Sequence, residues 1–116
     1  MSNGYVKRLP AVFYRLPSGR EPVREWLKGL NDADRKIIGE DIKDVELDWP
    51  VGMPVCRPLG DGLWEVRSDI TQGRISRVLF CIHHGRMVLL HGFIKKTQKT
   101  PLHELELARQ RTKDVR

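Results

Sequence analysis

Residues 63–96 have the sequence LWEVRSDITQGRISRVLFCIHHGRMVLLHGFIKK, which predicts three consecutive strands. It is rich in β-branched, aromatic and aliphatic residues, which are typical of buried strands. Two turns divide it: Thr71-Gln72-Gly73 ends the first hairpin, and His84-Gly85 has the pattern of a two-residue turn in which glycine supplies a positive φ. The segment therefore predicts a three-stranded antiparallel unit at the centre of the molecule.

The two turns also predict how the strands pair. A first loop centred on Gln72 places Arg67 opposite Arg77. A second loop at 84–85 pairs His83 with Arg86, and counting back from that pair places Arg77 opposite Gly92.

Cations within such apolar strands need a physical reason, because burying an unpaired charge is costly. Side chains alternate between the faces of a sheet, so this register predicts that Arg67, Arg77 and Lys96 converge on one face, beside open space left by a glycine. Like charges that face each other repel, and their convergence suggests a site for an anion. The alternative is that each cation pairs with a carboxylate such as Glu65 or Asp69.

The flanking sequence predicts helices on both faces of this sheet. Two apolar stripes at helical spacing indicate a helical hairpin packed on one face, formed by Val23, Trp26, Leu27 and Leu30 and by Ile38, Ile42, Val45 and Trp49. The expected elements are a strand at 11–16, a helix at 21–30, a helix capped by Asn31 and running to 49, a loop at 50–62 in which 55–59 offers a short edge strand, and a helix at 101–111 capped by Thr100. The fold class is α+β, with the last helix on the other sheet face.

Composition narrows the functional classes. With 116 residues the chain is expected to be a single domain, 1–116, and its net charge of +6 favours nucleic acid or an acidic protein as partner. No apolar run reaches the roughly 20 residues of a membrane span, and the N-terminus lacks the apolar region of a signal peptide. The two cysteines lack metal or CxxC spacing, so a reduced cytoplasmic protein is expected.

The four histidines do not have the spacing of a zinc site. His83 and His84 fall at a hairpin tip and are expected to be exposed. In the predicted register, His91 points to the face opposite Arg77, which is typical of a core histidine.

The run from LWEVR through RVLFCI to VLLHGFIKKTQKTP resembles the RelE/HigB toxin superfamily, and its nearest resemblance is to the phage-derived HigB-like branch of type II toxin–antitoxin systems. The resemblance covers residues 11–108. It implies a RelE-like fold and a ribosome-dependent mRNA endoribonuclease that inhibits translation. It further implies attack by the ribose 2′-hydroxyl without a metal or other cofactor. The implied partners are a helix-turn-helix, HigA-like antitoxin, mRNA and the ribosomal A site, with no membrane.

The resemblance also implies roles for residues of this chain. Arg77 matches the family's transition-state stabiliser. The other implied catalytic residues are Glu65, Arg67, Lys96 and His103, and the implied RNA-binding residues are Arg57, Arg74, Lys95 and Lys99. Arginine suits phosphate because its planar fork donates two parallel hydrogen bonds and keeps its charge. No tyrosine follows Lys96, which leaves the general base open.

Two other functions remain open at this point. One is a ParE-like toxin that uses the same scaffold to poison DNA gyrase. The cationic residues of the strands argue against it, because a gyrase inhibitor does not need to stabilise a phosphodiester. The other is a catalytically inactive relic that binds only its antitoxin.

Overall fold

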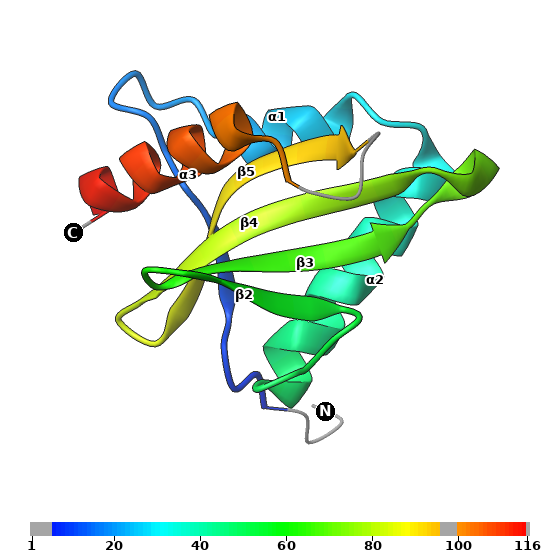
Figure 1. Cartoon of the computed structure of the whole chain (residues 1–116), viewed down its shortest axis with the longest axis horizontal. Coiled ribbons are helices and arrows are strands. Elements are labelled where there is room, and N and C mark those ends of the chain that lie inside the picture. Colours follow the sequence, from blue (N-terminus) through cyan, green and yellow to red (C-terminus); the bar gives the residue numbers. More distant parts are fainter. Residues whose placement is uncertain (1–5, 96–99, 116) are drawn as a thin grey trace.

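The computed structural model describes residues 6–95 and 100–115, which form an α+β fold. A five-stranded mixed sheet lies between two helical layers in this part of the chain (Figure 1). In chain order the elements are β1 (Ala11–Phe13), α1 (Pro22–Lys28), α2 (Asp32–Asp48), β2 (Cys56–Gly60), β3 (Leu63–Asp69), β4 (Ile75–His83), β5 (Arg86–Lys95) and α3 (Leu102–Val115), with a single 3₁₀ turn at Thr71–Gly73. The predicted fold class is confirmed.

The strand order is β1-β5-β4-β3-β2. The three central strands and β2 pair antiparallel, whereas β1 is a short edge strand that runs parallel to β5. The segment predicted as a strand at 11–16 is regular only over its first three residues. Its parallel partner lies more than 70 residues away in sequence, so no local pattern could specify the pairing.

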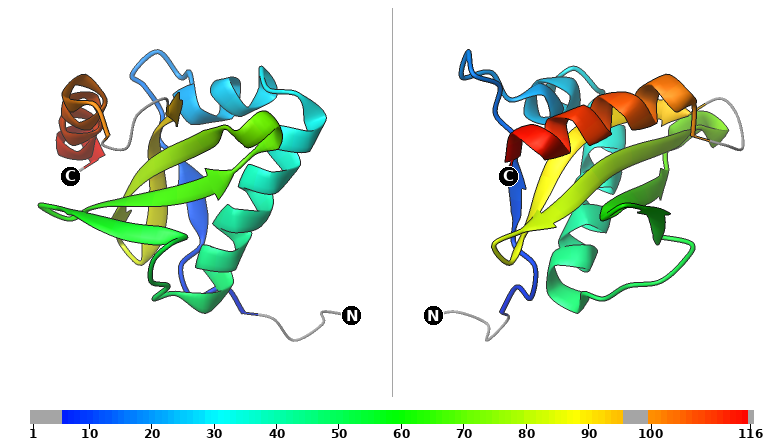
Figure 2. Two further views of the ribbon diagram at one scale, coloured as in Figure 1. Left: turned by 45° about the vertical axis from the view of Figure 1, so that its right-hand side comes forward. Right: turned by 60° about the vertical axis from the view of Figure 1, so that its left-hand side comes forward.

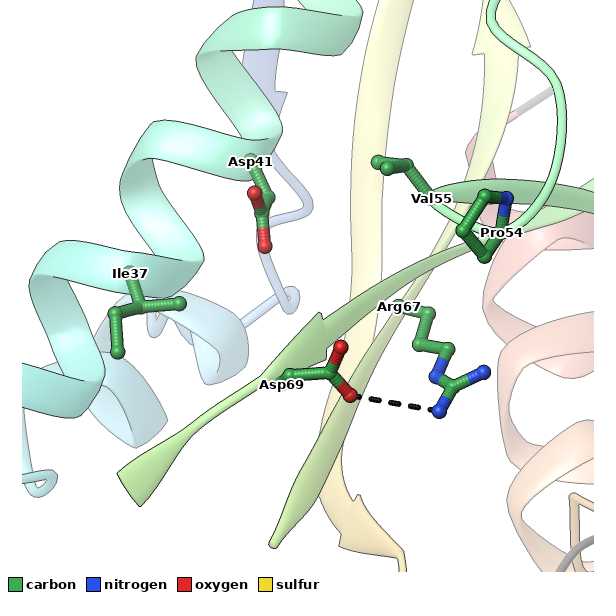
Figure 3. Close-up of a pocket in the computed structure, with 6 residues that line it drawn as sticks. All are labelled: Ile37, Asp41, Pro54, Val55, Arg67 and Asp69. Carbon is green, nitrogen blue, oxygen red and sulfur yellow. Dashed lines mark hydrogen bonds and ion pairs between the residues drawn. The ribbon is translucent and has the colours of Figure 1, made fainter. Parts of the chain in front are cut away.

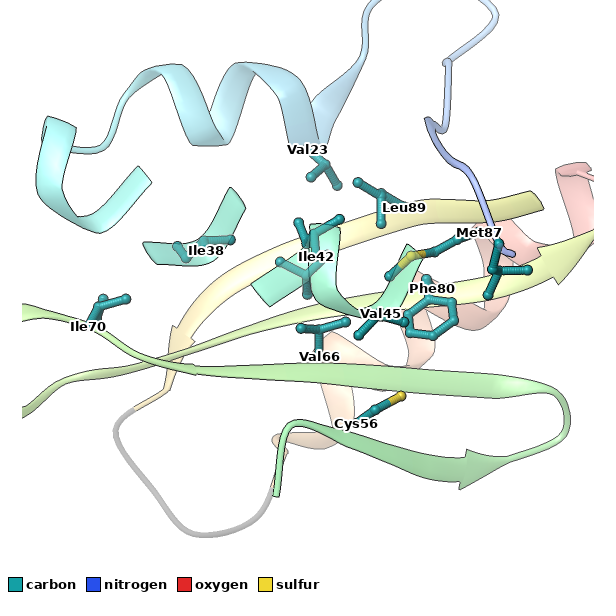
Figure 4. Packing of buried hydrophobic residues seen from close by; sticks show 12 residues of the cluster. Val23, Ile38, Ile42, Val45, Cys56, Val66, Ile70, Phe80, Met87 and Leu89 are labelled. Carbon is teal, nitrogen blue, oxygen red and sulfur yellow. The ribbon is translucent and has the colours of Figure 1, made fainter. Parts of the chain in front are cut away.

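Helices α1 and α2 cover one face of the sheet, and α3 covers the other (Figure 2). The larger core lies beneath the helical hairpin, as Figure 4 shows. Its buried side chains include Val23, Ile38, Ile42, Val45, Val66, Phe80, Met87 and Leu89. The helical stripe predicted from the sequence therefore packs on the sheet as expected.

The second core holds α3 against the opposite face. Ala108 of α3 is buried there among residues of β3, β4 and β5. Two polar contacts near the helix C-terminus add to this packing: Tyr14 donates to Asp114 at 2.8 Å, and Arg111 donates to the backbone carbonyl of Leu90 at 2.7 Å. The helix continues to residue 115, beyond the predicted end at 111, because these contacts stabilise its last turn.

The predicted register is correct on the first hairpin and at the tip of the second. Arg67 pairs with Arg77, and His83 pairs with Arg86. Beyond a β-bulge, however, Leu79 pairs with His91 while its neighbour Phe80 pairs with Leu89, so one residue of β5 is skipped.

This bulge corrects three predictions. Arg77 lies opposite Phe93 rather than Gly92. Because faces alternate, His91 and Lys95 point to the same face as Arg77, so the prediction that His91 lies on the opposite face is wrong. Gly92 points to the helical hairpin, where an added Cβ would clash with the ring of Trp26. The glycine therefore accommodates a core tryptophan and leaves no space beside Arg77.

Both cysteines are buried and neither forms a disulfide. They lie on opposite faces of the sheet, Cys56 in the larger core and Cys81 in the smaller one. Burial raises the pKa of the Cys56 thiol to about 11, which makes it unreactive near neutral pH. Within residues 6–95 and 100–115, no helix has the length and apolar character needed to cross a membrane. No three His, Cys, Asp or Glu side chains of the same residues gather as a candidate metal site.

Candidate functional site

Glu65 of β3 is the centre of a polar cluster on the α3 face of the sheet. Its side chain is fully buried, with an exposed fraction of 0 %. Its carboxylate forms an ion pair with Arg77 of β4 and a second one with Arg57 of β2, whose Nη2 lies 3.2 Å from Oε2. Thr100, just before α3, donates a 2.7 Å hydrogen bond to Oε1. Strand pairing explains this meeting, because Arg57 and Glu65 are direct partners across β2 and β3.

Lys95 joins the cluster from the end of β5. The residue is 6 % exposed. Burial lowers the pKa of its amine, the positive charge of Arg77 lowers it further, and the charge of Glu65 opposes both effects. Arg57 and Arg67 lower the pKa of Lys95 as well, so all four charged residues lie within electrostatic reach of its ammonium group.

Arg67 completes the group from β3, two residues beyond Glu65. One guanidinium nitrogen lies 3.4 Å from the carboxylate of Asp69, whose side chain is 81 % exposed. An ion pair with such an exposed carboxylate is weak, because water screens it. The guanidinium of Arg67 is therefore held only weakly by its ion pair with Asp69.

We call Arg57, Glu65, Arg67, Arg77 and Lys95 the Glu65 cluster. It contains four cationic side chains and one buried carboxylate. Among the described residues, the buried Nε atoms of Arg67 and Arg77 are hydrogen-bond donors without an acceptor. A group of excess positive charge and unused donors favours an anion that carries several oxygens, such as a phosphate.

The structure thus brings together five of the residues implied by the family resemblance. The predicted register placed Lys96 on this face of the sheet, and the observed pairing places Lys95 there. Lys96 and Lys99 lie outside the described residues.

Two other implied residues are placed differently. Arg74 binds Asp34 of α2 and Thr71, so its guanidinium is engaged away from the Glu65 cluster. His103, in the first turn of α3, is 79 % exposed, and its nearest described ionic partner is Glu104 at 3.6 Å.

Sequence reasoning missed His91 and the contact made by Thr100. The ring of His91 stacks on Phe93, and its Nε2 lies 2.8 Å from Oε1 of Glu104. The histidine was assigned to the wrong face because the bulge that turns it around has no clear signal in the residues. Thr100 was expected to act as a helix cap, but its hydroxyl binds Glu65 instead.

The sequence was also compared with known proteins. Residues 25–113 match the family described as Phage derived protein Gp49-like (DUF891). The match runs from α1 to α3 and includes every residue of the Glu65 cluster. No curated protein matches the chain significantly.

Proposed function

This chain belongs to the phage-derived Gp49-like family of RelE-like toxins from toxin–antitoxin systems, and we propose that it is a ribosome-dependent endoribonuclease that cleaves mRNA. In this proposal the protein acts in the cytoplasm, enters the ribosomal A site and stops translation. A HigA-like, helix-turn-helix antitoxin neutralises it. An acidic segment of that antitoxin would complement the charge of the cluster and accelerate association.

The observation that carries the proposal is the charge balance of the Glu65 cluster. In RNA cleavage without a metal, the 2′-oxygen attacks the adjacent phosphorus and the bond from phosphorus to the 5′-oxygen breaks. The 2′-hydroxyl proton leaves to a base, the 5′-oxygen gains a proton, and the products are a 2′,3′-cyclic phosphate and a 5′-hydroxyl. Negative charge grows on the phosphorane oxygens during this step, and fixed cations stabilise it.

The geometry suggests how the work is divided. Arg57 and Arg67, which are partly exposed, would bind the phosphate first. Arg77, which is more deeply buried, would then contact the phosphate oxygens from the floor of the site, on β4. Glu65 is too deeply buried to take a proton from a substrate, so its proposed role is to position Arg57 and Arg77. The lowered pKa of Lys95 brings its ammonium closer to the range of a proton donor for the leaving oxygen.

The remaining implied residues keep proposed roles at the rim. Thr100 is bound to Glu65, and His103 follows three residues later with an exposed ring, so His103 is the proposed proton acceptor. Lys96 and Lys99 adjoin Lys95 and Thr100 in sequence and are proposed to contact the RNA backbone. For Arg74, engaged by Asp34, a structural role fits better than RNA binding.

The test is cleavage of a defined mRNA by the purified protein with and without ribosomes. We expect cleavage only with ribosomes, and 2′,3′-cyclic phosphate ends. Arg77→Lys should reduce the rate by about 10²-fold or more, because lysine cannot reproduce the two-pronged contact. Arg74→Lys is the matched control, and it should cleave like the parent.

Because Arg77 is buried, its substitution could reduce activity by unfolding the protein, so a second variant at a more exposed residue is needed. Arg57→Gln alters a partly exposed side chain and should also slow cleavage while circular dichroism stays unchanged. Intact mRNA with the parent protein would exclude the nuclease. Full activity in both folded variants would exclude the Glu65 cluster as its active site.

A second function is favoured by one observation. Arg77 is only 6 % exposed and is engaged by Glu65, an arrangement that a purely structural ion pair also has. In a toxin or relic that acts only through protein contacts, this ion pair would serve the stability of the fold alone. Expression without antitoxin separates the cases: gyrase-dependent DNA breaks with intact mRNA indicate a ParE-like toxin, and harmless expression indicates a relic.

A further inference from the structure

A pocket opens at the edge of the sheet, and Arg67 of the Glu65 cluster is among the residues that line it (Figure 3). Its volume is about 220 Å³. It is formed by side chains from α2, from the loop before β2 and from the end of β3, and we call it the edge pocket. Its lining residues are Ile37, Asp41, Pro54, Val55, Arg67 and Asp69.

The edge pocket is joined to the Glu65 cluster by Arg67, which belongs to both. The backbone N–H of Arg67 donates to the carbonyl of Val55 at 2.7 Å, and this bond fixes the loop wall against β3. An RNA phosphate bound by the cluster would therefore have an adjacent nucleotide within reach of the pocket.

The lining combines three kinds of surface. Asp41 contributes a carboxylate, Asp69 and Arg67 contribute a carboxylate and a guanidinium that lie 3.4 Å apart, and Ile37 and Val55 offer aliphatic contact. A planar ring with both donors and acceptors on its edge matches this combination. The volume of about 220 Å³ holds several waters, so one planar ring can enter the pocket in their place.

We propose that the edge pocket binds the nucleobase next to the cleaved phosphate, and that it selects a base with an exocyclic amino group over uracil. The inference rests on the proposed function, because it assigns the base-reading subsite of the same active site. Carboxylates accept hydrogen bonds from an amino group such as N4 of cytosine, whereas uracil presents a carbonyl oxygen at that position and would be repelled.

Asp41 is the residue most suited to this selection. Burial raises the pKa of its carboxyl group, the Ser68 hydroxyl lowers it in part, and the negative charges of Asp44, Asp69 and Glu40 raise it further. A carboxylate that is poorly solvated and surrounded by like charge gains from a neutral donor. The amino group of a base supplies such a donor.

A cationic side chain from a partner protein is the competing occupant. It would be attracted by Asp41 and Asp69 but would meet the charge of Arg67 and, beyond it, the positive Glu65 cluster. A neutral base avoids that repulsion and uses the donors of Arg67 as well as the two carboxylates.

The first experiment measures binding without cleavage. Isothermal titration with CMP and UMP should show that CMP binds about tenfold more tightly to the parent protein. Asp41→Asn should remove most of this difference, because an amide can also donate to a carbonyl oxygen. Asp44→Asn is the matched control: it removes the same charge from the exposed side of α2, outside the pocket, and should keep the difference.

The second experiment measures codon preference in the ribosome assay. The parent should cleave beside amino-bearing bases, and Asp41→Asn should cleave beside uridine about tenfold more readily than the parent. Ile37→Phe, which fills the pocket, should weaken cleavage beside every base.

The outcomes separate the inference from the function on which it rests. Ribosome-dependent cleavage with a preference that neither pocket variant changes would overturn the inference alone. A preference for CMP that depends on Asp41, without any cleavage by the parent, would overturn the nuclease and keep the nucleotide site. Equal binding of CMP and UMP, or binding of N-acetylarginine amide in place of CMP, would assign the pocket to another ligand and overturn the inference.

Discussion

Asp34 and Glu65 are both buried carboxylates that hold an arginine, yet their surroundings differ in charge. Asp34, near the start of α2, accepts hydrogen bonds from the backbone and hydroxyl of Thr71 at 2.9 and 2.7 Å and forms an ion pair with Arg74. One cation and one anion balance each other there. The site joins α2 to the turn between β3 and β4, and nothing in it favours a further ligand.

The Glu65 site also combines a buried carboxylate, an arginine and a threonine, but it contains more cations for each carboxylate. Arg77 and Thr100 take the places of Arg74 and Thr71, but Arg57, Arg67 and Lys95 add three further cations around the same carboxylate. A fold gains no stability from such an excess, because the cations repel one another. A buried ion pair alone is therefore typical of a structural anchor, whereas a local surplus of positive charge favours an anionic ligand.

The largest expected effect comes from removing the carboxylate. Glu65→Gln should lower the free energy of unfolding by about 3–5 kcal/mol, because it leaves buried cations without their counter-ion. Urea unfolding monitored by tryptophan fluorescence measures this change. Inorganic phosphate should recover more stability in Glu65→Gln than it adds to the parent, whereas Asp34→Asn should gain only as much as the parent. Equal recovery in both variants would remove the distinction between the two sites.

Phosphate should also stabilise the parent protein, since it binds the folded state through the surplus cations. At a concentration one hundred times its dissociation constant, the gain is about 2.7 kcal/mol. Arg57→Gln should reduce this gain, and Arg74→Gln should leave it unchanged although both remove one arginine. Thermal unfolding across a phosphate titration, at constant ionic strength, is the measurement. A loss of the gain with Arg74→Gln would contradict the assignment.

The sequence predicted the core of the Glu65 cluster because the first hairpin specifies it locally. The short turn at 71–73 leaves one register, and that register sets Arg67 against Arg77. The same reasoning failed on β5. A single skipped residue reversed the faces of His91, Gly92 and Lys95, and a bulge depends on tertiary packing that the local pattern does not carry.

Long-range polar contacts were also beyond prediction. Asp34 reads as a favourable charge in the first turn of a helix, and Arg74 reads as one more strand cation. Their ion pair joins residues 40 positions apart, so only the assembled fold reveals that Arg74 is already occupied. The same holds for Thr100, whose bond to Glu65 spans 35 positions.

The stability contributed by the two sites should depend on pH in different ranges, alkaline for the Glu65 cluster and acidic for Asp34. Lys95 has a pKa below its usual 10.5, so between the two values the unfolded state binds more protons and stability rises with pH. The free energy of unfolding of the parent should therefore rise relative to that of Lys95→Met as pH increases toward 10.5. Urea titrations from pH 7 upward measure the difference. A gap that stays constant would mean that neither burial nor the neighbouring cations lower the pKa of Lys95 in the folded protein.

Asp34 provides the acidic counterpart. Burial alone would raise its pKa, but the hydrogen bonds from Thr71 and Arg74 outweigh burial and lower it below 3.8. Its contribution to stability is complete above 3.8 and is lost as pH falls through the lower folded value. Asp34→Asn should remove that acid dependence, and urea titrations below pH 5 would show whether it does.

The smallest expected effect is at the exposed partner of Arg67. Asp69→Asn breaks an ion pair of 3.4 Å in which the carboxylate is 81 % exposed, so the free energy of unfolding should fall by less than about 1 kcal/mol. The same change removes a competitor for the guanidinium, and the affinity for inorganic phosphate should rise by a few-fold. A stability loss well above that bound would place Asp69 with Asp34 as a structural anchor. Lower phosphate affinity would mean that Asp69 holds Arg67 in its binding position, so that the carboxylate supports the Glu65 cluster from outside.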